Sequence, residues 1–162
     1  KFGDSTYLIF AGSGNNAGDG FVLAGKLKKE FERIYVLSYG NDLKGLTKIN
    51  FEKVKLLAYE FGNADVLLRK LKHPLVLIDA MLGIGFHGEL REPIKSGVKL
   101  FNSLQGYKIA VDTPTGLDAD TGEFEDICVV DSIVTFHDIK PGLNKYKQIY
   151  PNVKIDVADI GL

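Results

Sequence analysis

Residues 7–20 read YLIFAGSGNNAGDG, and this stretch indicates the class of fold. Its apolar start, Tyr7–Ala11, has the length of a buried strand, and the glycines that follow permit positive φ and let a ligand approach the backbone closely. Apolar residues from Phe21 to Phe31 then recur at helical spacing, in a helix that we expect to run to about Glu32. The start of such a helix offers free backbone N–H groups and a favourable dipole to a phosphate.

Strands and helices alternate along the rest of the chain. Further strands are predicted at residues 34–39, 75–79, 108–112, 132–136 and 153–157, and helices at 47–61, 64–71 and 92–104. Short apolar strands separated by amphipathic helices are typical of a parallel sheet that helices cover on both faces. We therefore predict an α/β fold with three αβα layers and a Rossmann-like, mostly parallel sheet, in a single domain over residues 1–162.

The composition excludes several classes of protein. Lys and Arg number 20 against 21 Asp and Glu, so the chain lacks the net positive field that sequence-independent binding to nucleic acid requires. No apolar run is long enough to cross a membrane, and the first residues do not resemble a signal peptide. We expect a cytoplasmic protein with neither nucleic acid nor membrane as a partner. The single cysteine, Cys128, lies in an apolar stretch, and we predict a buried thiol rather than a nucleophile.

Three loops that follow predicted strands are rich in glycine and acidic residues. They are the glycine turn, GSGNNAGDG at 12–20; the covering loop, AMLGIGFHGELREP at 80–93 after Asp79; and the third loop, TPTGLDADTG at 113–122 after Asp112. Ligands of open parallel sheets bind beyond the carboxyl ends of the strands, so we expect these loops to converge on one site. Asp112 could be a general base or a cation ligand there, whereas simple capping of a turn is the alternative for each carboxylate.

The glycine turn differs from the two best-known phosphate-binding motifs. No Lys-Ser or Lys-Thr follows it, so it is not a P-loop, and Ala17 stands at the third glycine of the dinucleotide fingerprint, a tolerated variant. Its Asn and Asp side chains suggest contacts to sugar hydroxyls or a cation in addition to phosphate.

Four motifs in order resemble those of a known family. GSGNNAGDG at 12–20, DAMLGIGFHGELREP at 79–93, VDTPTGLDADTG at 111–122 and TFHDIKPGL at 135–143 are together similar to the NAD(P)HX epimerases, also called the YjeF N-terminal domain family. Each motif alone would be a weak signal, whereas the ordered combination is specific. The resemblance spans residues 7–161 and implies an isomerase of metabolite repair that interconverts the R and S forms of hydrated NADH and NADPH.

The resemblance also implies roles for individual residues. Substrate binding is implied for Asn15, Asn16, Ala17, Gly18 and Asp19 of the glycine turn, Gly83, Ile84, Gly85, Phe86, His87, Gly88 and Glu89 of the covering loop, Asp112, and Lys140. Asp112 would contact the nicotinamide end and act as the catalytic acid or base. Asn16, Asp79 and Thr115 would hold a potassium ion, to which hard oxygen ligands are suited. For Lys140, a solvated surface position is the alternative.

The sequence also differs from the family pattern. Ala17 replaces a more frequent glycine, and Thr113 and Thr115 replace Ile and Ser, the second exchange keeping the hydroxyl. The helical segment that precedes the first strand in the family is expected to be missing. Residues 157–162 resemble the point where fused relatives continue into an ADP- or ATP-dependent NAD(P)HX dehydratase, the functional partner that the family implies, together with a homodimer.

Two other functions compete with the epimerase. The same fold serves as a non-catalytic nucleotide-binding or dimerisation module in decapping scaffold proteins, whose loops are eroded, whereas here the loops are intact. An ordinary nicotinamide-dependent dehydrogenase would require an acidic residue at the end of the second strand to bind ribose. That strand ends in Ser38-Tyr39-Gly40, which argues against the dehydrogenase.

Overall fold

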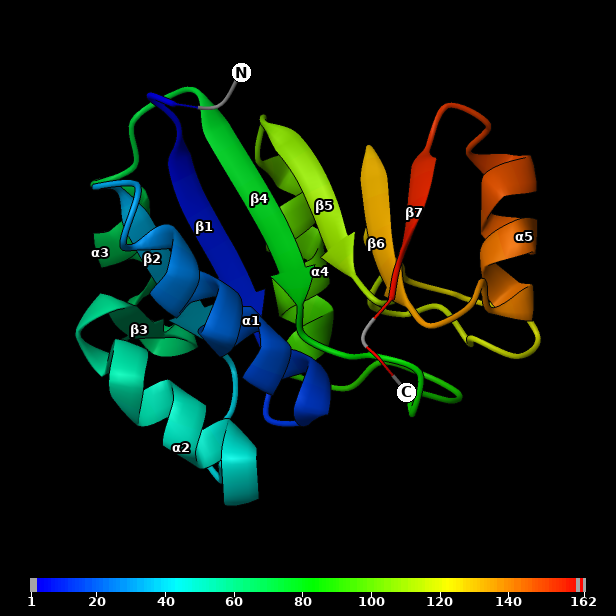
Figure 1. Cartoon of the computed structure of the whole chain (residues 1–162), viewed down its shortest axis with the longest axis horizontal. Helices are drawn as coiled ribbons and strands as arrows, with labels where there is room; N and C mark the ends of the chain where they lie inside the picture. The colour runs from blue at the N-terminus through cyan, green and yellow to red at the C-terminus, as the bar shows by residue number, and fades with distance from the viewer. Residues whose placement is uncertain (1–2, 160, 162) are drawn as a thin grey trace.

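Seven parallel strands form one sheet in the part of the chain that the structure describes, residues 3–159 and 161. The structure is a computed structural model. In spatial order the strands are β3 (Ala58–Glu60), β2 (Ile34–Ser38), β1 (Thr6–Ala11), β4 (Leu75–Ala80), β5 (Tyr107–Val111), β6 (Ser132–Phe136) and β7 (Lys154–Ala158) (Figure 1). Residues 1, 2, 160 and 162 of the predicted domain, and with them part of the predicted junction at 157–162, lie outside the described residues.

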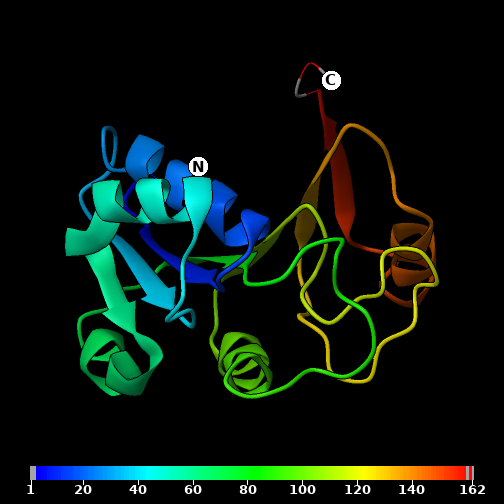
Figure 2. The same ribbon diagram turned by 90° about the horizontal axis from the view of Figure 1, so that it is seen from below.

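Helices cover both faces of the sheet, and the predicted three-layer α/β fold is confirmed. One face packs against α1 (Asn15–Leu27) and α2 (Gly45–Val54), and the other against α3 (Ala64–Leu68), α4 (Ile94–Ser103) and α5 (Pro141–Ile149) (Figures 1 and 2). Among the described residues, none of the helices combines the length and apolar character needed to cross a membrane.

The apolar core lies in two layers, one on each side of the sheet. Along β1, Leu8 and Phe10 point into the layer under α3, α4 and α5, and Ile9 and Ala11 point into the layer under α1 and α2. All four side chains are fully buried, as the alternation of a strand covered on both faces requires. Burial on both faces explains why residues 8–11 of this strand are all apolar.

The predicted helix over residues 47–61 is wrong in its second half. The helix α2 ends at Val54, a 3₁₀ turn follows at Lys55–Leu57, and residues 58–60 form the edge strand β3, which pairs with β2. The helical spacing of the apolar residues is only a local preference, and pairing with the exposed edge of β2 outweighs it. The next helix, α3, ends at Leu68 rather than at the predicted residue 71.

A helix that the sequence analysis did not predict, α5, follows β6. It begins at Pro141, a residue favoured in the first turn of a helix because its missing N–H costs nothing there. Leu143 and Tyr146 are fully buried against the sheet. Lys140 occupies the N-cap position of this helix, and its side chain makes no capping hydrogen bond.

The strand order reverses direction at β1. From β1 the chain first adds β2 and β3 on one side, and then returns to add β4, β5, β6 and β7 on the other side. In open parallel sheets this reversal opens a crevice at the carboxyl ends of the central strands. The glycine turn, the covering loop and the third loop all begin at that edge, as predicted.

Candidate functional site

The glycine turn packs directly against the start of the covering loop. A Cβ atom on Gly12 would overlap the carbonyl oxygen of Met81, so glycine is required for the two loops to touch. Gly14 precedes the first residue of α1 in an extended conformation, and no side chain caps the helix. The first N–H groups of α1 are therefore available to a ligand, and the position suits a phosphate.

Oxygen atoms gather beneath this turn around Asp79, which is fully buried near the end of β4. Its Oδ1 accepts hydrogen bonds from Thr115 Oγ1 at 2.6 Å and from the Met81 N–H at 3.2 Å, and its Oδ2 accepts the Thr115 N–H at 2.7 Å. Burial raises the pKa of Asp79, while these hydrogen bonds oppose the rise. No Lys, Arg or His among residues 3–159 forms an ion pair with this carboxyl group.

Asn16 completes the cluster of oxygens. Its side-chain nitrogen donates to the carbonyl oxygen of Leu82 at 2.8 Å, and the Leu82 N–H donates to Thr115 Oγ1 at 3.0 Å. The side-chain oxygen Oδ1 of Asn16 is buried without a hydrogen-bond partner. A buried polar atom without a partner is costly, so this atom indicates a ligand that the protein itself does not supply. The structure thus brings together the predicted set of Asn16, Asp79 and Thr115.

Asp112 and Lys140 form a second polar cluster at the ends of β5 and β6. Asp112 leaves β5 with φ +66°, a left-handed conformation that non-glycine residues adopt rarely and that often marks functional sites. Its Oδ1 accepts hydrogen bonds from Lys140 Nζ at 2.7 Å and from Thr135 Oγ1 at 3.1 Å. Lys140 Nζ also donates to Thr135 Oγ1 at 2.8 Å and to the Phe136 carbonyl at 2.6 Å. Lys140 is therefore a bound, largely buried cation, and the solvated alternative is wrong.

The two clusters border a cavity of about 580 Å³ at the carboxyl edge of the sheet. Asp112 lines this cavity, and all the hydrogen bonds from described residues to that carboxylate end on Oδ1, so Oδ2 is left for a ligand. Asp19 faces the same cavity, and partial burial together with the nearby charge of Asp112 raises the pKa of Asp19. A ligand that fills the cavity would contact the start of α1 and Asp112 at once.

An ion pair ties the covering loop to the third loop. His87 Nδ1 lies 2.8 Å from Asp118 Oδ2, and this hydrogen bond raises the pKa of His87. The pKa of Asp118 is held well below its usual range, first by the Thr121 N–H and then by His87. Asp118 lies within one of the four motifs, but its role could not be predicted from the sequence because its partner lies 31 residues away.

The predicted substrate-binding residues do not all reach the cavity. Its lining contains Asn15, Asn16, Asp19, Gly83, Ile84, Gly85, Phe86, His87 and Asp112. Of the others, Ala17 and Gly18 are buried, Ala17 in the core and Gly18 against Thr47 of α2. Gly88 and Glu89 lie beside the cavity in the outer part of the covering loop. Lys140 lies behind Asp112 and reaches the cavity only through it.

Two further residues of the site have clear positions. Thr135 is fully buried, and its hydroxyl bridges Asp112 and Lys140; its place in the motif TFHDIKPGL was the only signal in the sequence. Cys128 is fully buried, which confirms the prediction. Burial and the adjacent Asp79 raise the pKa of its thiol well above the ordinary value.

The amino-acid sequence matches the family described as YjeF-related protein N-terminus over residues 1–142. A bifunctional NAD(P)H-hydrate repair enzyme of Archaeoglobus fulgidus is 41% identical over an alignment that covers 100% of this chain and 33% of that protein. NAD(P)H-hydrate epimerases of Cenarchaeum symbiosum and Nitrosopumilus maritimus are 37% and 39% identical, covering 94% and 88% of this chain and 74% and 68% of those proteins. The chain therefore spans about a third of the bifunctional relative.

A solved structure has the same fold. The crystal structure of the yeast protein ynu0 superimposes with a TM-score of 0.81, covering 96% of this chain and 66% of the yeast chain, at 24% sequence identity. This likeness supports the fold described above.

Proposed function

The chain belongs to the family of YjeF-related N-terminal domains, and from this premise we propose that it is an NAD(P)H-hydrate epimerase, an isomerase that interconverts the two epimers of hydrated NADH or NADPH. The observation that carries the proposal is Asp112, a left-handed residue that binds Lys140 through its side chain and lines a cavity that begins at the uncapped start of α1. This arrangement suits a phosphate-bearing ligand with a reacting group at the far end.

The substrate is proposed to enter with its pyrophosphate at the start of α1. The glycine turn allows the phosphate oxygens to approach the free N–H groups, and the dipole of α1 favours their charge. The nicotinamide end then reaches Asp112 across the cavity, beneath residues 83–87 of the covering loop. The ion pair between His87 and Asp118 holds that loop in place.

Asp112 is proposed to carry out the proton transfers. Epimerisation moves a hydroxyl group from one face of the hydrated ring carbon to the other, so a bond to that carbon breaks and re-forms. A proton must be delivered and removed as this happens, and one carboxyl group can do both in turn. Lys140 and Thr135 fix Oδ1, which directs Oδ2 toward the substrate.

Asn16, Asp79 and Thr115 are proposed to hold a potassium ion. The partnerless Oδ1 of Asn16 and the buried carboxyl group of Asp79 fit such an ion, because they supply hard oxygen atoms and a charge that no described side chain neutralises. A bound potassium ion would supply positive charge near the substrate phosphates. We expect the wild-type thermal midpoint to be higher in potassium chloride than in choline chloride of equal ionic strength, and Thr115→Val to remove this difference. An equal midpoint in both salts would contradict the assignment.

The activity is tested with a mixture of NADPHX epimers and an excess of a dehydratase specific for one epimer. NADPH recovery, followed by near-ultraviolet absorbance, should lose its slow fraction when the chain is added. Asp112→Asn should slow epimerisation by about 10²–10⁴-fold, and Asn tolerates the left-handed conformation, so the fold is preserved. Asp156→Asn, at an exposed position on β7, serves as the matched control.

The outcomes separate the two functions that the intact loops leave open. Equal rates for Asp112→Asn and wild type would refute the role of Asp112. If the wild-type chain binds the nucleotide without epimerising it, the non-catalytic binding module is the better description.

The remaining proposals concern context and rest on the family. We propose that the chain works with an ADP- or ATP-dependent NAD(P)HX dehydratase. In this proposal, a bifunctional relative such as the repair enzyme of Archaeoglobus fulgidus carries the epimerase and the dehydratase in one chain. We also propose a cytoplasmic homodimer that binds neither nucleic acid nor membranes. Light scattering coupled to size-exclusion chromatography tests the dimer, and a monomeric mass at micromolar concentration would contradict it.

A further inference from the structure

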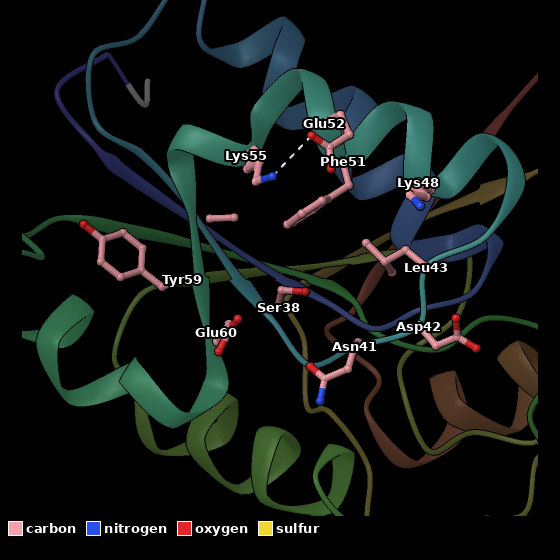
Figure 3. A pocket seen from close by; sticks show the side chains of 12 residues that line it. Ser38, Asn41, Asp42, Leu43, Lys48, Phe51, Glu52, Lys55, Tyr59 and Glu60 are labelled. Carbon is pink, nitrogen blue, oxygen red and sulfur yellow. Dashed lines mark hydrogen bonds and ion pairs between the residues drawn. The ribbon is translucent and has the colours of Figure 1, made fainter.

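A second cavity lies at the same edge of the sheet, beyond the ends of β2 and β3. It measures about 620 Å³ and lies between these strand ends and α2 (Figure 3). None of the residues predicted from the sequence to bind substrate lines it. Ser38 and Glu60 line it from the strand ends, whereas the apolar Leu43 and Phe51 line it from the α2 side, where Lys48, Glu52 and Lys55 also lie (Figure 3).

Ser38 at the end of β2 gives the strongest sign of a ligand. Its side chain is 7% exposed, and its hydroxyl oxygen is buried without a hydrogen-bond partner although the residue lines the cavity. A hydroxyl in that state is costly unless a ligand or water satisfies it. Glu60 of β3 is the register partner of Ser38, so the two side chains stand at the same level of the sheet.

The charges of the lining are largely paired, except at two places. Lys55 pairs with Glu52 at 3.5 Å, and Asp42 pairs with Lys44 at 2.9 Å. Among the described residues, Glu60 and Lys48 take part in no ion pair. Figure 3 shows Lys48 on the α2 side of the cavity, well separated from Glu60 and Ser38. A ligand bound at Ser38 therefore meets a negative charge.

The second cavity adjoins the glycine turn. A Cβ on Gly40, which lines the cavity, would lie 2.7 Å from the Ser13 side chain, and Thr47 of α2 donates a hydrogen bond to the Gly14 carbonyl at 3.2 Å. The turn thus stands between the two cavities, with β2 on one side of β1 and β4 on the other. In sheets with this strand order, a dinucleotide lies across the turn, with adenosine toward the second strand and nicotinamide toward the fourth.

We propose that this cavity binds the adenosine half of the substrate, with Ser38 and Glu60 hydrogen-bonded to the ribose hydroxyls, and that the chain therefore prefers NADHX to NADPHX. The inference rests on the proposed function. A free 2′-hydroxyl donates a hydrogen bond to the Glu60 carboxylate, whereas a 2′-phosphate brings like charge against it and finds no hydrogen-bond donor in that carboxylate. Phe51 and Leu43 supply an apolar surface for the adenine ring.

The carboxylate comes from an unexpected strand. A dehydrogenase takes its ribose-binding acid from the end of the second strand, where this chain has Ser38. Here the neighbouring strand β3, which the sequence analysis placed inside a helix, supplies Glu60 at the same level.

The test compares two probes that lack nicotinamide, ADP-ribose and its 2′-phosphate, by isothermal titration calorimetry. We expect ADP-ribose to bind wild type at least about tenfold more tightly than the 2′-phosphate. Glu60→Gln should reduce the preference for ADP-ribose to below about threefold, and Ser38→Ala should weaken the binding of ADP-ribose by about threefold or more. Glu32→Gln, at an exposed position just before the amino end of β2, should change neither the preference nor the affinity for ADP-ribose.

Three outcomes overturn the inference: equal affinity for the two probes, an unchanged preference in Glu60→Gln, or no binding of either probe. The wild-type epimerase assay, run with NADHX and with NADPHX, separates this result from the proposed function. If wild type epimerises both substrates at equal kcat/KM, the function stands and the preference fails. If it epimerises neither but binds ADP-ribose selectively, the cavity assignment stands and the function fails.

Discussion

Replacing Lys140 by methionine tests the central cluster of the site. Lys140 Nζ makes hydrogen bonds of 2.7, 2.8 and 2.6 Å to Asp112, Thr135 and the Phe136 carbonyl. Methionine fills a similar volume but leaves the carboxylate of Asp112 without its cation. The side chains of Lys140 and Asp112 are 18% and 12% exposed. The loss in free energy of unfolding should therefore fall between the values for fully buried and fully exposed ion pairs.

The magnitude follows from those limits. Breaking a fully buried pair costs about 3–5 kcal/mol, and breaking an exposed pair costs about 0–1 kcal/mol. We therefore expect Lys140→Met to lower the free energy of unfolding by about 2–3 kcal/mol. Because much of this cost is the stranded charge of Asp112, the double variant with Asp112→Asn should be more stable than the sum of the single changes by about 1–2 kcal/mol.

The assay is urea denaturation at pH 7 followed by far-ultraviolet circular dichroism, because the chain contains no tryptophan. Lys154→Met, at an exposed position on β7, is the control and should stay within about 0.5 kcal/mol of wild type. The epimerisation rate of Lys140→Met should also fall, since Oδ1 of Asp112 then keeps only the longer hydrogen bonds from Thr135 Oγ1 and the Phe136 N–H, at 3.1 and 3.3 Å. Strictly additive changes in the free energy of unfolding of the double variant, or a Lys140→Met protein as stable as wild type, would refute the reasoning.

Two further predictions concern the loops. Gly12→Ala should destabilise the protein by more than about 3 kcal/mol, because its methyl group would overlap the Met81 carbonyl oxygen, whereas Gly14→Ala, with open space around the added atom, should cost less than about 1 kcal/mol in the same urea assay. The hydrogen bond to Asp118 raises the pKa of His87 in the folded state. The ion pair therefore stabilises the fold fully below the ordinary histidine pKa of about 6.5, and this stabilisation is lost as the pH rises through the higher pKa of the folded state. The stability difference between wild type and His87→Gln should shrink from pH 5.5 to pH 8.5, and a constant difference would contradict this role.

The local pattern of the sequence was enough to predict the class of fold. Runs such as Leu75–Ile78 are apolar throughout because both faces of the strand are buried, and the intervening helices show a period near 3.6. Glycine at 12 and 14 and carboxylates at strand ends marked the edge that carries the site, since parallel strands present their carboxyl ends together. These signals are readable because each depends on residues close in the sequence.

Tertiary structure decided the features that depend on distant partners. Residues 58–60 form a strand only because the edge of β2 is available to them, and this strand brings Glu60 level with Ser38. The link between Asp112 and Lys140 spans 28 residues, and the link between Asp79 and Thr115 spans 36. Sequence alone indicated that the three loops lie at the carboxyl edge, whereas the folded chain decided which of their side chains are buried, paired or left without a partner, because those states depend on atoms that only the packed sheet brings together.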